Sequence, residues 1–525
     1  MKLYYELSLI LGLIYLLIKS KKAIHMLQQN WYNEDDRYIN WIFNNKKKVF
    51  LIFDLVFIIF LFLKGRVLLI SFVLYFIICY YINKIKVKNE QTKKPLVYTP
   101  RVKRLYITIT IFYIIVGYIT TILWYNELNL SFYCFYIGLI IYLNYLFIYL
   151  CNVINKPIEK LVFNHYKNMA KSKLESMNYL KKIAITGSYG KTSTKNFVNE
   201  ILNVKYNSFA TPASFNTMNG LMISINNKLD KFTDIFVAEM GASRTGEIVE
   251  KTKFIRPQYG ILTIIGSAHL ESFGSQENIQ KGKFELIDNL PDDGVAILNM
   301  DDKYQTSYDI KSKCKKIWVS FDNKKADVYA SDIKMSSKGT SFKCHFKNES
   351  ITLETKLLGI HNIYNILQSA ALAYELGLTL QEIQTGVKRI KSVEHRLELK
   401  KMGDITIIDD AYNSNPVGSS RALEVLELMD GKKIIVTPGM IELASKQYEL
   451  NMEFGRHIAK VCDEVILIGE EQTKPILDGL KKEKYNESKI HILNDVKKAF
   501  PLMRKLADKN TYVLLENDLP DIFNE

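Results

Sequence analysis

The stretch KKIAITGSYGKTSTKNFVNEIL, residues 181–202, decides the fold of the larger part of this 525-residue chain. A short apolar strand at Ile183–Ile185 enters a glycine-containing loop, and a helix is expected to follow from Thr192. Glycines in such a loop let backbone amides approach phosphate oxygens, and the helix N-terminus adds a favourable dipole. This order predicts a nucleotide-binding phosphate loop formed by Gly187, Ser188, Tyr189, Gly190, Lys191, Thr192 and Ser193.

The side chains of this loop suggest ATP as the nucleotide and Mg²⁺ as its metal. Lys191 is expected against the β- and γ-phosphates, and the Thr192 hydroxyl is expected to bind Mg²⁺. Glu239 follows the apolar strand Ile235–Ala238, so its carboxylate should emerge beside the loop at the carboxyl end of that strand. Mg²⁺ prefers hard oxygen donors, which makes Glu239 a candidate ligand. The alternative is a solvated acid at a strand end.

Seven motifs then follow in an order that resembles a known enzyme family. The loop TGSYGKTST is shorter than the general GxxxxGK[ST] pattern and is similar to that of the Mur ligases and folylpolyglutamate synthases. These enzymes activate a carboxylate with ATP and couple it to an amine. The other six motifs also resemble this family, and TPASFNTMNG (Thr211–Gly220), VAEMGASRTGEI (Val237–Ile248) and DDAYNSNP (Asp409–Pro416) favour its MurF-type branch, which adds D-alanyl-D-alanine to a muramoyl tripeptide. The remaining three are AHLESFGS (Ala268–Ser275), GIHNIYN (Gly359–Asn365) and HRLE (His395–Glu398).

The resemblance, which covers about residues 181–470, implies a second Mg²⁺ site. His269 within AHLE matches the family histidine that helps to hold this ion. Lys283 lies fourteen residues later, at the spacing where Mur ligases carry a carbamylated lysine. A carbamate is an anion and could bind the metal near the transferred phosphate. Two alternatives remain open, namely that Lys281 takes this role or that Lys283 is an ordinary surface lysine.

The resemblance also assigns residues to the nucleotide. Asn362 and Asn365 match family asparagines near the adenine, while Arg396 and Asp410 match positions near the γ-phosphate and the ribose. The loop after Asp410 continues through Tyr412, Asn413 and Asn415, and Asn415-Pro416 is a natural helix start. Four residues are thereby implied in catalysis: Lys191, His269, Lys283 and Arg396.

The first 154 residues have a different character and predict a membrane domain. They hold 18 Lys and Arg against 7 Asp and Glu, a net charge of +11 out of +15 for the chain. This excess is interleaved with apolar runs, which excludes a nucleic-acid groove and favours membrane flanks. Five spans are expected at Leu3–Ile18, Val49–Leu63, Val67–Ile82, Tyr106–Trp124 and Ser131–Ile154. The alternative is four spans, with the first run lying in the interface.

Loop charges predict the orientation of this domain. Residues 19–48 carry seven Lys and Arg, and residues 83–105 carry eight, so both loops are expected in the cytoplasm. Everything after residue 154 then lies in the cytoplasm as well. The six cysteines are scattered and form no CxxC pair, which argues against a disulfide scaffold and against a zinc ribbon.

The expected fold class is an α-helical membrane domain (1–154), a linker (155–180), a P-loop α/β ATPase domain (181–395) and a Rossmann-like C-terminal domain (396–525). Two features depart from the Mur ligase pattern. Hydrophobic helices are expected in place of the usual UDP-binding N-terminal domain, and the end TYVLLENDLPDIF has no KGSRG-like sequence.

Together these features predict a membrane-anchored, MurF-like ATP-dependent ligase of cell-wall peptidoglycan synthesis that works through an acyl phosphate. Its expected partners are a UDP- or lipid-linked precursor with a free carboxylate, an amino acid or dipeptide such as D-alanyl-D-alanine, and membrane lipid, with no nucleic acid. Two alternatives stay open. One is an amide ligase acting on a poly-γ-glutamate-like polymer, and the other is a non-catalytic nucleotide-binding membrane scaffold.

Overall fold

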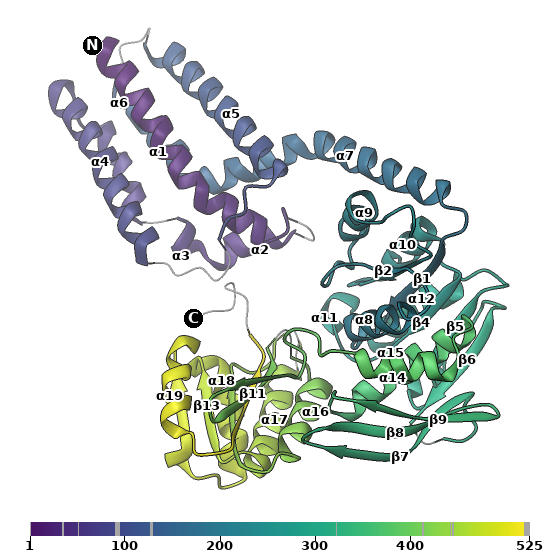
Figure 1. Cartoon of the computed structure of the whole chain (residues 1–525). Helices are drawn as coiled ribbons and strands as arrows, with labels where there is room; N and C mark the ends of the chain where they lie inside the picture. The colour runs from purple at the N-terminus through teal and green to yellow at the C-terminus, as the bar shows by residue number, and fades with distance from the viewer. Residues whose placement is uncertain are drawn as a thin grey trace. The chain divides into compact units, whose positions relative to one another are not determined.

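The structure, a computed structural model, describes residues 2–33, 36–50, 52–89, 95–125, 130–321, 323–411, 414–441, 443 and 446–518. The chain forms two compact units, a helical one that extends to His165 and an α/β one that begins at Tyr166 (Figure 1). Each unit has its own hydrophobic core.

The helical unit is a bundle of apolar helices with an aromatic-rich core. Figure 1 shows α1, α4, α5 and α6 side by side in this unit. Buried rings such as Phe60, Phe72 and Tyr75 pack edge to face in its core. Its elements are α1 (Lys2–Gln29), α2 (Arg37–Asn44), α3 (Lys46–Val49), the 3₁₀ helix η2 (Ile52–Leu61), α4 (Gly65–Asn89), α5 (Pro100–Tyr125), α6 (Leu130–Tyr142) and the first part of α7 (Asn144–Ser176).

Five membrane spans were expected, and the structure supports fewer. Among the described residues, two helices are long and apolar enough to cross a membrane, at Gly65–Ile82 in α4 and Pro100–Thr120 in α5. The expected span 131–154 is broken, because α6 ends at Tyr142 and α7 leaves it at an angle of 69°. This bent pair gives a third span if it is counted as one. The second expected run contains only a ten-residue 3₁₀ helix, which is about 20 Å long against a hydrocarbon core of about 30 Å.

The phosphate-loop sequence lies in a nine-stranded sheet. Its strand order is β2-β3-β1-β4-β5-β6-β7-β8-β9, parallel as far as β7 and antiparallel from there on. The strands are β1 (Lys181–Thr186), β2 (Ser208–Ala210), β3 (Ile235–Glu239), β4 (Tyr259–Leu262), β5 (Val295–Asn299), β6 (Lys315–Ser320), β7 (Val328–Ser336), β8 (Gly339–Phe346) and β9 (Glu349–Thr355). Central strands such as β3 and β5 are buried along their whole length, as expected for a parallel sheet covered by helices.

Helices cover this sheet and return the chain from its carboxyl edge to its amino edge, so the parallel strands all end at the same edge. Their bounds are α8 (Lys191–Leu202), α9 (Met218–Asn227), α10 (Glu247–Ile255), α11 (Leu270–Phe273), α12 (Gln276–Asp288), α13 (Lys303–Thr306), α14 (Ile360–Glu375) and α15 (Leu380–Arg389). The loops after β1, β3 and β4 therefore gather at one edge, where ligands bind in open α/β sheets.

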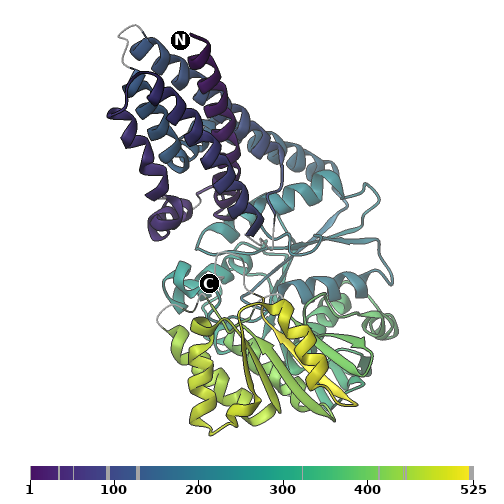
Figure 2. The ribbon, with the colours of Figure 1, turned by 90° about the vertical axis from the view of Figure 1, so that its left-hand side faces the viewer.

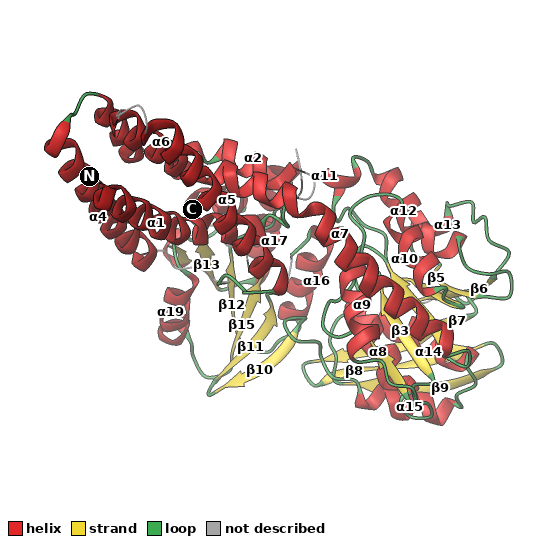
Figure 3. Cartoon of the chain, turned by 90° about the horizontal axis from the view of Figure 1, so that it is seen from above, coloured by secondary structure: helices red, strands yellow, loops and turns green. Residues whose placement is uncertain are grey.

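The C-terminal domain is a second α/β layer and confirms the predicted Rossmann-like order. Figure 3 shows its strands β10, β11, β15, β12 and β13 side by side in this sequence, with β14 completing the sheet. All neighbours except β10 and β11 are parallel. The strands are β10 (Glu398–Met402), β11 (Ile405–Asp410), β12 (Lys432–Thr437), β13 (Glu464–Ile468), β14 (Ile490–Leu493) and β15 (Thr511–Glu516).

Helices flank this second sheet, as Figure 2 shows in the yellow-green part of the ribbon. They are α16 (Pro416–Glu427), α17 (Gln447–Val461), α18 (Glu470–Lys482) and α19 (Ala499–Leu506), with short 3₁₀ turns η4 (Glu487–Lys489) and η5 (Val496–Lys498). Strand β11 ends at Asp410, so the acid predicted to face the ribose stands at the carboxyl edge of this sheet.

Candidate nucleotide and metal site

The phosphate loop has the geometry that its glycines predict. Gly190 has a φ of 79°, and a Cβ there would lie 2.8 Å from Asn365 Oδ1. A Cβ at Gly187 would lie 1.9 Å from Thr263 Oγ1. The loop is fixed from the next strand, since Thr263 Oγ1 donates to the Tyr189 carbonyl at 2.6 Å. The backbone therefore approaches its neighbours too closely for any side chain at these two positions.

Lys191 begins α8 and folds back over the loop. Its Nζ donates to the carbonyls of Gly187 at 2.8 Å and Ser188 at 2.9 Å. Burial lowers the pKa of Lys191 to about 8, while the nearby Glu239 carboxylate acts in the opposite direction. The predicted cation is thus held above the loop by backbone carbonyls.

Glu239 and Thr192 meet as the sequence predicted. Glu239 ends β3 and is fully buried, and its Oε1 accepts hydrogen bonds from Thr192 Oγ1 and Asn216 Nδ2, both at 3.1 Å. The hydroxyl and the carboxylate supply the hard oxygens that Mg²⁺ prefers. This excludes the alternative of a solvated acid at the strand end.

Lys195 is a site residue that the sequence reasoning missed. It lies one turn after Lys191 on α8, is fully buried, and places Nζ 3.2 Å from Glu239 Oε2. The same Nζ donates to the carbonyl of Ala213, in the motif TPASFNTMNG. Lys195 therefore connects the phosphate-loop helix, the candidate metal ligand and the loop at Thr211–Gly220. A lysine four residues after the loop lysine, on the buried face of an amphipathic helix, was the available signal.

We expect Lys195→Met to lower stability strongly, by about 3–5 kcal/mol, because it leaves the buried Glu239 carboxylate without its cation. The double variant Lys195→Met/Glu239→Gln should recover part of this loss, since no buried charge then remains. Thermal and urea unfolding of the purified full chain measure both effects. A cost for Lys195→Met no larger than that of an exposed pair, about 1 kcal/mol or less, would contradict this role.

His269 and Lys283 lie near this site, in different settings. His269 immediately precedes α11 with a φ of 61° and lines the same cavity as Lys191 and Glu239. Lys283 lies on α12, is 1% exposed, and donates from Nζ to the Ala242 carbonyl at 3.0 Å. Its Nζ is 5.1 Å from the centre of the Phe273 ring. Lys283 is therefore no ordinary surface lysine, whereas Lys281 is exposed.

The amine of Lys283 has an unusual electrostatic setting. Burial, together with the positive charges of Lys191 and Lys251, lowers the pKa of Lys283 well below its usual value. A neutral amine is the form that reacts with CO₂ to give a carbamate. Within the described ranges, no three His, Cys, Asp or Glu side chains converge to hold a metal by themselves. A second Mg²⁺ would thus need an additional anion here, which a carbamate at Lys283 would supply.

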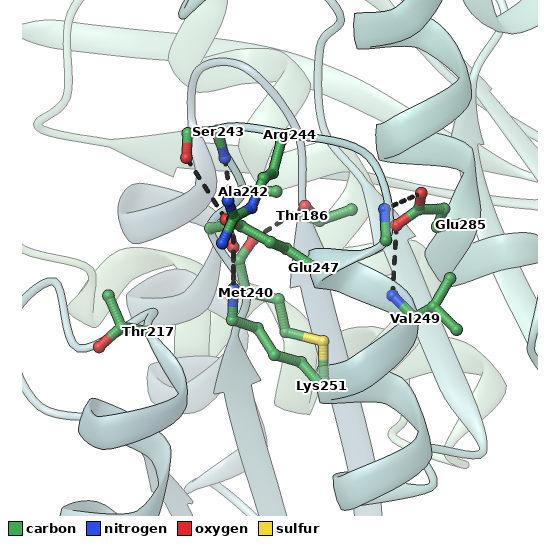
Figure 4. A network of polar contacts seen from close by, with 12 residues as sticks. Thr186, Thr217, Met240, Ala242, Ser243, Arg244, Glu247, Val249, Lys251 and Glu285 are labelled. Atoms are coloured by element: carbon green, nitrogen blue, oxygen red, sulfur yellow. Dashed lines mark hydrogen bonds and ion pairs between the residues drawn. The ribbon is translucent and has the colours of Figure 1, made fainter. Parts of the chain in front are cut away.

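The loop after Glu239 is held by a network of charged side chains, of which Lys251 is buried and Glu247 and Glu285 are partly exposed (Figure 4). Lys251 Nζ donates to the Gly241 carbonyl at 2.5 Å, and Glu247 accepts from the Ser243 amide at 3.1 Å. Glu285 accepts the backbone amides of Gly246 at 2.5 Å and Val249 at 3.2 Å, which satisfies the N-terminus of α10. The Ala242 carbonyl, the acceptor for Lys283, therefore sits on a firmly positioned loop.

The residues assigned to the nucleotide line a single cavity of about 370 Å³ that takes walls from both α/β domains. Asn365 on α14 accepts a hydrogen bond from Thr194 Oγ1 at 3.1 Å, and Asn362, one turn earlier, donates to the Leu358 carbonyl at 2.8 Å. Arg396 and Asp410 line the cavity from the C-terminal side. The predicted Asn415 cap is confirmed, because its Oδ1 accepts the Gly418 amide at 2.9 Å. Tyr412 and Asn413 lie outside the described residues.

His361 was not predicted, although it stands in the quoted motif GIHNIYN. It lines the cavity at the start of α14. Its Nδ1 is buried and has no hydrogen-bond partner within the part of the chain that the structure describes. Burial lowers the pKa of His361 to about 4, and the charges of Arg421 and Arg396 act in the same direction. A neutral imidazole with an unpaired nitrogen is available to a ligand in this cavity.

A pair of carboxyl groups lies where β11 and β15 end. Asp410 and Glu516 are register neighbours on these parallel strands, and Glu516 is 1% exposed. Ser414 Oγ donates to Glu516 Oε1 at 2.7 Å. Burial raises the pKa of Asp410 to about 6 against the lowering effect of Arg396, and burial together with Asp410 raises the pKa of Glu516 well above its usual value. The pair therefore keeps a proton at pH values where isolated carboxyl groups have lost theirs.

We expect this pair to make the protein less stable as the pH rises. A carboxyl group whose folded pKa is raised stabilises the fold below its unfolded pKa, and this contribution is lost as the pH rises through the folded pKa. The melting temperature should thus fall by several degrees between about pH 5 and about pH 8, and Glu516→Gln should flatten the fall. The control is Glu349→Gln, at an exposed position. Equal slopes for all three proteins would contradict the paired state.

Comparison with known proteins agrees with this geometry. Residues 185–373 match the Mur ligase middle domain, and residues 395–516 match the Mur ligase glutamate ligase domain. The UDP-N-acetylmuramoyl-tripeptide–D-alanyl-D-alanine ligase of Buchnera aphidicola (subsp. Baizongia pistaciae) is 31% identical over 336 residues, which are 63% of this chain and 71% of that protein.

The chain belongs to the Mur ligase family.

Other relatives with the same name match this chain over a shorter stretch. The Escherichia coli and Bacillus subtilis proteins are each 31% identical, over 55% and 56% of this chain. The match spans just under two thirds of their own length, 64% and 63%. Neither domain match includes the helical unit.

Solved Mur ligases share the fold of the α/β unit. A MurF from Acinetobacter baumannii superposes with a TM-score of 0.62 at 25% identity, over 69% of this chain and 78% of that one. MurF from Thermotoga maritima in complex with ADP gives 0.61 at 25% identity, over 69% and 81%. The predicted family and the α/β architecture are thereby confirmed.

Proposed function

We propose that this protein is a membrane-anchored, ATP-dependent peptide ligase of peptidoglycan synthesis, similar to the D-alanyl-D-alanine-adding enzymes. The observation that carries the proposal is the cavity, which brings Lys191, Glu239, Asn365, Arg396 and Asp410 together from two domains. Relatives named as such ligases align with this chain over 292 and 336 residues. A scaffold without catalysis would have no need for buried charges around a metal position.

The cavity fits ATP and one Mg²⁺ by its own chemistry. Gly187 and Gly190 have no side chains that would block phosphate from the loop backbone, and Thr192 with Glu239 supplies oxygen donors for the metal. When bound, Mg²⁺ would neutralise charge on the phosphoryl oxygens. His269, with a carbamate on Lys283, would hold a second ion. Lys191 and Arg396 would stabilise the negative charge that develops at the γ-phosphate.

The reaction proposed for this site has two steps. A carboxylate oxygen of the acceptor attacks the γ-phosphorus of ATP, ADP leaves, and an acyl phosphate results. The nitrogen of an amine then attacks the acyl carbon, inorganic phosphate leaves, and the nitrogen loses a proton to give the amide. The contribution of the chain is positioning and charge stabilisation, which suffice for phosphoryl transfer.

Membrane anchoring is proposed from α4 and α5, with α6 and the start of α7 as a third passage. The basic loop 83–105, which joins α4 to α5, would face the cytoplasm, and the third passage would bring the ligase domains to the same side. A helical unit in front of the α/β domains favours an acceptor presented at the membrane surface, such as a lipid-linked precursor. The amine would be an amino acid or a dipeptide such as D-alanyl-D-alanine.

Product analysis tests the proposal. The detergent-purified full chain is incubated with ATP, Mg²⁺, D-alanyl-D-alanine and either UDP-linked or lipid-linked muramoyl peptides. We expect mass spectrometry to show one acceptor heavier by the dipeptide less one water, together with ADP. Amide formation only on a poly-γ-glutamate acceptor would move the protein to the alternative class, and ATP turnover without any amide product would overturn both.

A further inference from the structure

Helix α7 carries an exposed apolar stripe along its first half. Leu150, Ile154, Ile158 and Leu161 are 43%, 51%, 50% and 70% exposed. They follow one another at intervals of four, four and three residues, which places them on one face of the helix. The stripe is long enough to need a covering partner, unlike a single exposed apolar side chain.

The opposite flank of α7 is tied to the helical unit by polar contacts. Asn152, which is 3% exposed, donates to the Tyr32 carbonyl at 3.0 Å. Thr108 Oγ1 donates to Asn155 Oδ1 at 2.7 Å, one turn further along α7. These contacts fix the rotation of α7 about its axis, and this rotation directs the apolar stripe away from the bundle.

An ion pair between α5 and α7 fixes the position of the stripe segment along α5. Arg104 donates from Nε and Nη2 to the two carboxylate oxygens of Glu159 at 2.7 and 2.6 Å. Such bidentate pairs are geometrically specific. Arg104 lies about one turn inside α5, which begins at Pro100 and is one of the two candidate spans. The end of the stripe, at Ile158 and Leu161, is therefore level with the basic end of that span, where a headgroup region is expected, while Asn155 lies about one turn further into the span, at Thr108.

The distribution of charge on α7 and the direction of α7 both agree with an interfacial helix. Lys156 and Lys160 are exposed and lie on the side of α7 away from the stripe, so apolar and charged residues are separated. The 69° bend after α6 turns α7 away from the direction of the bundle helices. A helix that bends away in this manner and reaches the basic end of a neighbouring span has the geometry expected of a segment at a membrane surface.

We propose that residues 150–161 of α7 form an interfacial membrane helix, with the stripe Leu150, Ile154, Ile158 and Leu161 inserted into the headgroup–acyl boundary of a lipid bilayer. This rests on the proposed membrane placement of α4 and α5. It assigns the bent pair of helices one short passage through the bilayer followed by a segment on its surface. The other conceivable covers, a second copy or another part of this chain, are distinguished by the test.

The test uses the full chain in vesicles with single introduced cysteines that carry an environment-sensitive fluorophore. All six native cysteines are buried, which keeps the label on the introduced site. Leu161→Cys probes the stripe, Lys160→Cys is the matched control on the other side of α7, and Ile111→Cys, at a 52% exposed position of α5, reports the membrane span. Quenchers are lipids labelled near the headgroup, lipids labelled deep in the chain, and aqueous iodide.

We expect the Leu161 label to be quenched at least about twofold more by the shallow lipid than by the deep one or by iodide, because such helices insert only about 5–10 Å. The Lys160 label should respond to iodide, and the Ile111 label to the deep lipid. Quenching of Leu161 by iodide, or by no quencher, while Ile111 still responds to lipid would overturn the interfacial helix and leave the anchor intact. Loss of the lipid response at Ile111 as well would overturn the membrane anchor itself.

Discussion

Lys191→Ala should reduce ATP-dependent amide formation by about 10³-fold, the cost of removing one strong charge-stabilising group from a transition state. The lysine begins α8 and makes its hydrogen bonds to the loop carbonyls of Gly187 and Ser188, so the role proposed for it is to supply charge at the phosphates and not to pack in the core. The measurement is the rate of product formation by mass spectrometry, with nucleotide affinity determined separately by fluorescence.

The matched control is Lys228→Ala, which removes an exposed lysine of the same domain and should leave the rate unchanged. Unfolding temperatures of the two variants should agree within a few degrees, which shows that the lost activity is chemical. Normal turnover in Lys191→Ala would contradict the ligase proposal, because no other described lysine lies over the loop carbonyls in the same way.

Lys283→Ala should remove activity for the opposite electrostatic reason, namely the loss of an anion. The proposal is that the buried Lys283 amine carries a carbamate and binds the second Mg²⁺. Residues that only hydrogen-bond to the ligands of a metal already change metal affinity or activity by about 10–100-fold. Loss of a direct ligand should therefore lower the rate by at least about 100-fold. Because burial lowers the pKa of Lys283 well below its usual value, a larger share of its amine is in the uncharged form that reacts with CO₂.

Two controls separate a carbamate from an ordinary buried lysine. Lys281→Ala, two residues earlier and exposed, should be close to silent. Added formate or acetate should partly restore Lys283→Ala, since a small carboxylate can take the place of the carbamate. In the wild type, ¹³C-labelled CO₂ should give a carbamate signal that Lys283→Ala lacks. A fully active Lys283→Ala would mean that the second metal is held otherwise.

Most residues of the candidate nucleotide site could be predicted from short stretches of the sequence. The phosphate loop, Glu239 at the end of its strand and the Asn362–Asn365 helical turn each need only neighbouring residues to define them. What could not be predicted depends on pairing between distant segments. Glu516 becomes a partner of Asp410 only because β15 inserts between β11 and β12, across 106 positions of sequence. Local patterns carry no information about such a register.

The helical unit illustrates the same limit for hydropathy. An apolar run predicts burial in protein or lipid, but not the continuity of a helix. Residues 131–154 read as one span, yet the chain bends at Leu143, where Lys19 donates to the Ile141 carbonyl at 3.0 Å and Ser20 to Asn144 Oδ1 at 3.0 Å. The Lys19 side chain of a distant helix thus pairs with a backbone carbonyl next to the break, and Ser20 pairs with the Asn144 side chain, which no window of local sequence reveals.

The division of the nucleotide cavity between two sheets has a consequence for inhibition. The loop lysine belongs to the middle domain, whereas Arg396 lies within, and Asp410 lies after, a connection in which His395 and Leu397 have φ values of 57° and 46°. A nucleotide that touches both walls would hold the two domains together and protect this connection from proteolysis. A compound wedged between the domains would weaken nucleotide affinity without contacting the phosphate loop, and resistance could then arise far from any residue that binds ATP.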